Sequence, residues 1–479
     1  MKIFPHIAAM ILAVSVESVA NAQVTNLSNQ ALFLRCYAQF TQMRPADNHP
    51  LLLQVIAGTK DPVTACLQVL NKGLWTSSGN TRLPATPDEE SLAVVQTFHK
   101  VHTTWFDIKE SAPVANSTFS AGTKDLLDQE VPALHFTQAL FKPSASFSKI
   151  VTANASLRPI RTTQSPTSGP ASNGTKTESI FGNAVPWTAT GDLLGARDIS
   201  ATELAVPYSY VEANDATVKT PAVNLGQNFG GGFIGEQTYL LQTFGLTRTF
   251  TSNGAERMPR KFGRSLFHDA LCRQLPVIRP EDAIPFVVAT SNVPFRTSSG
   301  CVRCHASMDR VSATARNLVY LVRGIGTITD GPFRGFEILV PHSLSQMPAE
   351  ATWPSAADNS YYRRPTNGVF YFRNYLGNLV NTNVSSLDAL GDVIAAQDDF
   401  YICAAKRYYH YLTGIDVSIA DVSDPAGGVF MSQRDSYHRD VVIELGLGLK
   451  ESQSSRSLIE AILRLPAYKR TDFGAGLNQ

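Results

Sequence analysis

The pentapeptide Cys301-Val302-Arg303-Cys304-His305 constrains this chain more than any other segment. The spacing C-x-x-C-H is typical of a c-type haem attachment site, in which each cysteine sulfur adds to a haem vinyl group. On a helix the two sulfurs lie one turn apart, and the following histidine then reaches the iron as the proximal ligand. The sequence therefore predicts one covalent haem c, attached through Cys301 and Cys304, with His305 on the iron.

Two other interpretations of the pentapeptide stay open. Cys301 and Cys304 are also half of a four-ligand zinc site, but the sequence has no second C-x-x-C and no H-x3–5-H pair downstream. A redox-active C-x-x-C pair normally lies at a helix start in a strand–helix–strand unit, and no such pattern surrounds the two cysteines. Haem attachment is the interpretation that the sequence favours.

The N-terminus is typical of an exported protein. Lys2 supplies a positive charge, residues 7–16 form an apolar run, and Ala20-Asn21-Ala22 has the small-residue pattern of a cleavage site. The run is too short to span a bilayer, and no later stretch approaches the roughly 20 apolar residues of a transmembrane helix. We expect a signal peptide at residues 1–22 and a periplasmic or secreted chain without a transmembrane segment. An uncleaved anchor is the alternative.

Four further cysteines are predicted to form two disulfides, because an even number in an oxidising compartment favours pairing. Four cysteines allow three pairings. Cys36 and Cys66 both lie in the N-terminal helical region, so we predict the pairs Cys36–Cys66 and Cys272–Cys403. The second bridge would join the segment before the pentapeptide to the C-terminal helices. The alternative is that all four are small, buried apolar side chains.

The charge balance narrows the class of partner. The chain has 41 Lys and Arg residues against 40 Asp and Glu residues, a formal net charge of +1. A nucleic-acid-binding protein normally carries a basic surface, so nucleic acid is not an expected partner. The same balance gives no strong field to steer a highly charged redox partner. The identity of any redox partner stays unknown at this point.

The whole chain is predicted to be a mainly α, multi-subdomain helical protein with a cytochrome c-like haem domain and a short β-hairpin. Residues 153–185 are rich in Ser, Thr, Pro, Asn and Gly and predict an irregular connection. Residues 369–372 and 378–380 predict the hairpin. Helix-spaced apolar positions and helix-start signals predict helices over residues 30–40, 63–70, 88–105, 235–246, 258–273, 313–322, 387–394, 398–411, 435–449 and 455–465.

This pattern divides the chain into consecutive parts, because it is too long for one simple core. After the signal peptide we predict an N-terminal helical domain at 23–150 and an irregular linker region at 151–225. A cytochrome c-like haem domain follows at 226–350, and a C-terminal helical domain occupies 351–479.

The distal side of the iron decides between classes of haem protein, because methionine, histidine and an open position give different chemistry. Met347 is the predicted distal ligand. It lies 42 residues after His305, and the following Pro348 stiffens its loop. Small class I cytochromes c often carry Met-Pro at about this separation, which this segment resembles. His342 and an open site are the alternatives, and the other candidates are Met258, Met308, Met431, His268, His410 and His438.

Several motifs together resemble the uncharacterised cytochrome-c-like domains of planctomycete-type bacterial cytochromes. They are Gly230 to Gly235, Arg264 to Phe267, Leu271-Cys272, Leu275-Pro276, Ser299 to His305 with Met308-Asp309, Phe400 to Cys403 with Tyr408-Tyr409, Leu412 to Gly414, Leu458-Ile459 and Leu465 to Tyr468. The resemblance covers residues 225–470 and implies a secreted single-haem protein with Cys301, Cys304 and His305 on the cofactor. Many relatives follow Met-Asp with Pro, whereas this chain has Arg310-Val311-Ser312.

Three functions are compatible with these features. The first is an exported mono-haem c-type cytochrome that transfers electrons with His/Met ligation. The second is a haem-dependent oxidoreductase, similar to a peroxidase or oxidase, with an open or displaceable distal site and an acid–base group near the iron. The third is a binding or scaffold protein in which the haem is structural or sensory. No catalytic residue is predicted.

Overall fold

The computed structural model describes most of the 479-residue chain. The described residues are 25–106, 130–164, 189–198, 211–212, 215–219, 228–243, 260–292, 294–316, 318–324, 337–343, 365–424 and 431–473. The predicted signal peptide at residues 1–22 lies outside them. Helices dominate the described part, together with four two-stranded antiparallel sheets, as predicted for a mainly α protein.

The N-terminal part consists of helices that begin at local sequence signals. Three of them have a side-chain cap at the first turn, where Ser28, Asp61 and Asp88 accept hydrogen bonds from backbone amides three residues later. The caps at Asp61 and Asp88 confirm the helix starts predicted there. Ser28 lies two residues before the predicted start of the first helix at residue 30. The helices are α1 (Asn29–Thr41), α2 (Pro50–Ile56), α3 (Pro62–Lys72), α4 (Glu89–Thr103), α5 (Val131–Phe141) and α6 (Lys149–Thr152).

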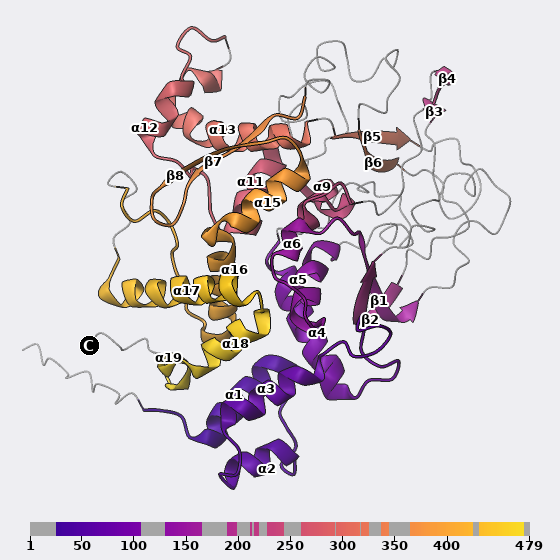
Figure 1. Cartoon of the computed structure of the whole chain (residues 1–479), viewed down its shortest axis with the longest axis vertical. Helices are drawn as coiled ribbons and strands as arrows, with labels where there is room; N and C mark the ends of the chain where they lie inside the picture. Colours follow the sequence, from indigo (N-terminus) through magenta and orange to yellow (C-terminus); the bar gives the residue numbers. More distant parts are fainter. Residues whose placement is uncertain are drawn as a thin grey trace, which may run out of the picture.

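The C-terminal helices pack against the N-terminal ones, so the first and last described segments lie side by side (Figure 1). The Leu27 amide donates to the Lys469 carbonyl, and the Arg35 guanidinium donates to the Tyr468 carbonyl. All four longer helices were predicted. The elements are α15 (Leu387–Ala396), α16 (Asp398–Thr413), α17 (Gln433–Ser452), α18 (Ser455–Arg464) and α19 (Pro466–Lys469).

Strands occupy part of the region predicted to be irregular. β1 (Leu157–Gln164) pairs with β2 (Ala189–Asp198), and β3 (Val211–Glu212) pairs with β4 (Asp215–Lys219). The prediction of an irregular connection is therefore wrong where β1 lies. The apolar side chains of Leu157 and Leu193 are buried on the N-terminal helices. The sequence gives no periodic signal for this strand pair. Contacts with the N-terminal helices stabilise the strands instead, and such contacts cannot be recognised from a local pattern.

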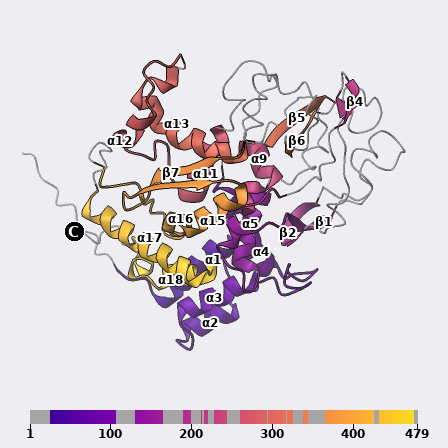
Figure 2. The ribbon, with the colours of Figure 1, turned by 45° about the horizontal axis from the view of Figure 1, so that its top comes forward.

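The central part places the pentapeptide on a helix. The elements there are η4 (Gly232–Gly235), α9 (Gln237–Thr243), α11 (Arg260–Leu271), α12 (Pro280–Ala283), η5 (Ile284–Phe286), η6 (Pro294–Arg296) and α13 (Ser299–Ser312). Figure 2 shows α13 lying across α11 and β7 (Gly368–Arg373). β7 pairs with β8 (Leu379–Val384) and confirms the predicted hairpin.

One predicted helix is wrong. Residues 313–322 form the short 3-10 turn η7 (Ala313–Ala315) and then the strand β5 (Leu318–Gly324), which pairs with β6 (Glu337–Ser343). The run from Leu318 to Val322 is rich in β-branched and aromatic residues, which favour strands. A short apolar run does not distinguish a helix from a strand, and here the partner strand decides.

The Gly230–Gly235 motif provides close backbone packing between η4 and its neighbours. The φ angle of Gly232 is +62°, and a Cβ atom there would lie 2.0 Å from the Ile150 carbonyl oxygen. At Gly231 a Cβ atom would lie 2.4 Å from the Leu387 carbonyl oxygen. Only glycine allows this contact between η4, α6 and α15.

One large hydrophobic core extends through the described residues, from Leu32 to Tyr468, and takes side chains from all four predicted ranges after the signal peptide. A second, small cluster lies beside it. The division at 150, 225 and 350 stays a prediction. Both predicted disulfides, Cys36–Cys66 and Cys272–Cys403, are present. Within the described part of the chain, the helices are all too short or too polar to cross a membrane.

Candidate haem-attachment site

Helix α13 places Cys301 at the surface, while Val302 of the same pentapeptide lies on the buried face of the helix. Val302 and Ala306 pack with Tyr371 and neighbouring apolar side chains in a small cluster beside β7. The opposite positions carry the two cysteines that remain outside the disulfides. Cys301 is exposed and Cys304 is partly buried, and this burial raises the pKa of the Cys304 thiol. Both side chains therefore remain as thiols.

His305 is held in a fixed orientation by three side chains. Its Nδ1 donates to Asp309 Oδ2 at 3.0 Å, and Arg260 Nε donates to Asp309 Oδ1 at 2.9 Å. The Phe295 ring stacks on the imidazole, with centroids 4.2 Å apart and 19° between the planes. The Arg260 guanidinium lies 4.8 Å from the Phe295 centroid and closes the ring of contacts. We call His305, Asp309, Arg260 and Phe295 the histidine clamp.

The described residues fit a c-type haem. One helix, α13, carries all three side chains of the motif. Cys304 lies three residues, or about one turn, after Cys301, and His305 is the next residue along the helix. Because Asp309 occupies Nδ1, the ring presents Nε2 for a metal. Nε2 has no hydrogen-bond partner among the described residues. Two free thiols and one histidine with an open Nε2 are the donor set that the motif requires.

The predicted distal ligand, Met347, lies outside the described residues, as does Met258. His342 is in β6, where its backbone pairs with Val319, and its side chain is outside the described part. Met308 is on α13 itself, three residues after His305. His268 and His410 line one pocket, and Met431 and His438 line another, whose wall also includes Arg303 of the pentapeptide. Among the described residues, no hydrogen bond or ring contact joins any of these four side chains to His305. Met347 stays a prediction.

The zinc interpretation gains no further ligands from this part of the chain. Over the described ranges, there is no group of three or more His, Cys, Asp and Glu side chains arranged to hold a metal ion. Cys301 and Cys304 also do not form a disulfide with each other.

The sequence analysis missed three members of the clamp. Asp309 follows His305 by four residues, a spacing that places both side chains on one face of a helix, so it was accessible to sequence reasoning. Arg260 is 49 residues from Asp309, and Phe295 belongs to a short turn on another element. Their contacts depend on how α11 and η6 pack on α13, and no local pattern indicates that packing.

Comparison with known proteins gives no further assignment. No protein-family model matches this chain, and neither a curated protein nor a solved structure matches it.

Proposed function

We propose that this chain is an exported mono-haem c-type cytochrome that transfers electrons. The observation that supports the proposal is the arrangement of Cys301, Cys304 and His305 on one helix, with both thiols free and His305 Nδ1 held by Asp309. The two disulfides support the export part of the proposal, because such bonds persist in oxidising compartments.

A bound haem would supply reversible one-electron chemistry at its iron. The residues of the clamp set the conditions for it. Asp309 holds the Nδ1 proton of His305 and increases the electron density on the ring, while Arg260 offsets part of the carboxylate charge. Phe295 stacks on the imidazole and restricts its rotation. The proximal histidine is therefore fixed in both orientation and tautomer.

The exposure of the attachment face suits transfer to another protein. Cys301 is exposed, and the side chain of His305 retains 22% of its accessible surface. A group attached at these positions has an edge near solvent, where a redox partner approaches. The near-zero net charge favours a partner recognised by local contacts instead of a long-range field.

The test separates a carrier from a haem enzyme. The protein is exported from cells that attach haem c, and its absorption spectrum is recorded in the oxidised and reduced states. A low-spin spectrum, unchanged by azide or peroxide, is expected for a carrier with two protein ligands. A high-spin spectrum that shifts with either reagent would instead support the oxidoreductase with an open distal site. Retained haem with neither electron exchange nor ligand binding would support the scaffold.

A further inference from the structure

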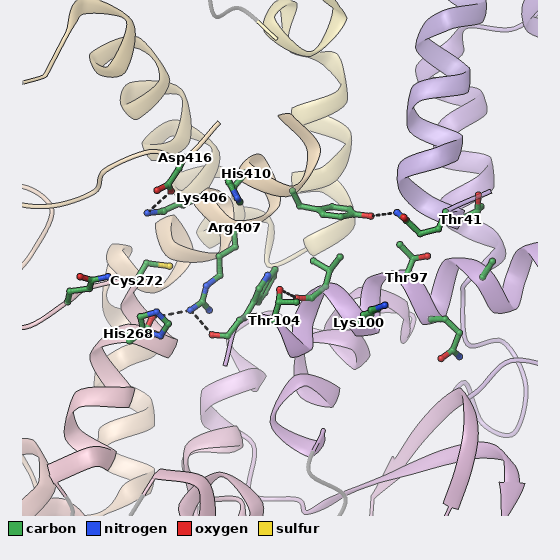
Figure 3. A pocket seen from close by; sticks show the side chains of 17 residues that line it. Thr41, Thr97, Lys100, Thr104, His268, Cys272, Lys406, Arg407, His410 and Asp416 are labelled. Atoms are coloured by element: carbon green, nitrogen blue, oxygen red, sulfur yellow. Dashed lines mark hydrogen bonds and ion pairs between the residues drawn. The ribbon is translucent and has the colours of Figure 1, made fainter. Parts of the chain in front are cut away.

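The Cys272–Cys403 disulfide is set in the wall of a pocket. Residues of α4, α11 and α16 line this pocket, which has a volume of about 830 Å³, and Cys272 directly follows α11 in its wall (Figure 3). Cys272 also lines a second pocket, of about 750 Å³. Both volumes are in the range of small-molecule sites. A small molecule in either pocket therefore lies against Cys272.

The two disulfides of the chain differ in the burial of their cysteines. Cys36, Cys66 and Cys403 retain at most 1% of their accessible surface, whereas Cys272 is only partly buried. A disulfide is opened by a thiolate that attacks one sulfur and expels the other, and access decides which sulfur is attacked. In the folded protein, access favours attack at Cys272, with Cys403 as the sulfur that leaves.

His268 provides a base in the same wall. It lies one turn before Cys272, whose amide donates to the His268 carbonyl at 3.0 Å. Nδ1 of His268 lies 2.7 Å from Oδ1 of the buried Asp269, and the other oxygen of this carboxylate accepts a hydrogen bond from Tyr239. The carboxylate holds the proton of the neutral ring on Nδ1, which leaves Nε2 as an acceptor. The His268 side chain is 49% exposed, so Nε2 can take a proton from a thiol in the pocket.

Arg407 places a positive charge beside the disulfide. It follows Cys403 by four residues on α16, a spacing that puts both side chains on one face of the helix. Its guanidinium donates at 3.0 Å to the same His268 carbonyl that accepts from the Cys272 amide. Burial lowers the pKa of this guanidinium to about 10, so it stays charged at neutral pH. A nearby positive charge stabilises a thiolate, which offsets the cost of forming one at the buried Cys403.

Lys406 adds a second, weaker charge. It follows Cys403 by three residues on α16, and its Nζ lies 3.0 Å from Oδ1 of Asp416, which offsets part of its charge. Figure 3 shows Lys406, Cys272 and His268 at the same end of the pocket. An accessible disulfide, an oriented base and positive charge near the leaving sulfur therefore meet at this end. These are the groups that thiol–disulfide exchange uses.

We propose that the Cys272–Cys403 disulfide is an exchange site for low-molecular-weight thiols that enter this pocket. The thiol gives its proton to Nε2 of His268, and its sulfur bonds to Cys272 Sγ. The bond between Cys272 and Cys403 breaks, its electron pair stays on Cys403 Sγ, and that sulfur takes up a proton. A second thiol then attacks the mixed disulfide, so that two thiols are oxidised to one disulfide and both cysteines are reduced. This site is independent of the haem and does not rest on the proposed function.

The test is the initial rate at which mercaptoethanol reduces each disulfide of the whole, folded protein. Iodoacetamide first blocks free thiols, including the two cysteines of the pentapeptide where they carry no haem. N-ethylmaleimide then labels the thiols that reduction releases, and peptide masses identify them. We expect the Cys272–Cys403 bond to be reduced at least about ten-fold faster than Cys36–Cys66, because a buried disulfide is reached only when the fold opens. In guanidinium chloride the two rates should converge.

The site of the adduct tests the direction of attack. With mercaptoethanol at a limiting concentration, the mixed disulfide should be found on Cys272 and the N-ethylmaleimide label on Cys403. A mixed disulfide mainly on Cys403 would contradict attack from the pocket.

His268→Gln tests the base. The variant should slow reduction of Cys272–Cys403 by mercaptoethanol about ten-fold. Its reduction by the neutral tris(hydroxypropyl)phosphine should be unchanged, because a phosphine attacks the sulfur without losing a proton. A purely structural role of His268 would change both rates equally. His410→Gln is the matched control: His410 is exposed and lines the same pocket, and its replacement should leave both rates unchanged.

Three results would overturn the proposal. The first is reduction of both disulfides at equal rates in the folded protein. The second is a mixed disulfide formed mainly on Cys403. The third is an effect of His268→Gln that is absent, or that is the same for the thiol and the phosphine.

Discussion

Asp309 accepts a hydrogen bond from Nδ1 of His305 at 3.0 Å, one turn further along α13. The same carboxylate accepts two hydrogen bonds from Arg260, at 2.9 and 3.3 Å, on the neighbouring helix α11. Asp309 is thus the junction between α13, which carries the two cysteines, and α11. The orientation of His305 depends on packing between two helices and not on α13 alone.

Asp309→Asn tests the electrostatic part of this arrangement. The amide oxygen still accepts from His305, but the charge and the strong pair with Arg260 are lost. We expect the free energy of unfolding to fall by about 1–3 kcal/mol, since the pair is mostly buried. In the haem-loaded protein the reduction potential should rise, because a less electron-rich imidazole stabilises the oxidised iron less. Urea denaturation and a potentiometric titration measure the two effects.

Asp47→Asn is the matched control for this variant, because Asp47 and its partner Arg44 are both almost fully exposed. Its unfolding free energy and reduction potential should equal those of the wild type. If Asp309→Asn changes neither quantity, the carboxylate has no role at His305.

The two disulfides should differ in their contribution to stability. The Cys272–Cys403 bond closes a span of 131 residues and the Cys36–Cys66 bond a span of 30. In the chain-entropy model these spans correspond to about 5 and about 3.5 kcal/mol, respectively. Urea denaturation of the paired alanine variants should therefore show a larger loss for Cys272→Ala with Cys403→Ala. A larger loss for the N-terminal pair would show that local packing outweighs loop entropy.

Asp399 predicts a specific pH dependence. The side chain is buried at the start of α16, and this burial raises its pKa to about 6, against the opposing attraction of Arg273. The folded state therefore holds the proton more tightly than the unfolded state does. This stabilisation is complete below about pH 4 and is lost as the pH rises through about 6.

Asp399→Asn should consequently raise the unfolding free energy at pH 7 by about 2–3 kcal/mol relative to the wild type, with no gain at pH 4. Denaturation curves at the two pH values measure the difference, and the exposed Asp392 provides a control variant, Asp392→Asn. A gain of equal size at both pH values would show that ionisation of Asp399 is not its cause.

Met347→Ala tests the distal ligand. If the sulfur binds the oxidised iron, the wild type shows a methionine–iron charge-transfer band that the variant lacks, and the variant binds azide. Met308→Ala is the control on the proximal helix and should retain the band. A wild-type spectrum without the band would assign the distal position to another ligand or leave it open.

The features that could be predicted from the sequence are those with local causes. The caps Asp61 and Asp88 lie within one turn of the amides they bind, and each is evident from residue type and spacing. The hairpin of β7 and β8 has adjacent strands and a short turn. The proposed haem attachment also rests on five consecutive residues, 301–305, and it stays a prediction.

The features that could not be predicted depend on distant partners. The sequence of β5 is equally compatible with a helix, and its pairing with β6 decides that it forms a strand. Arg260 and Phe295 reach His305 only because α11 and η6 pack on α13. One pocket is likewise lined by Lys100, His268 and Lys406, which no spacing in the chain relates to one another. Tertiary packing, which a single sequence does not display, decides all three.

The most direct measurement of the central claim is the intact mass of the protein exported from cells that attach haem c, taken after acid–acetone extraction. We predict that the mass exceeds that of the polypeptide by one haem, and that the paired variant Cys301→Ala with Cys304→Ala has the mass of the polypeptide alone. A wild-type chain without added mass, recovered from cells that attach haem to a control cytochrome, would contradict the assignment of Cys301, Cys304 and His305 to a haem.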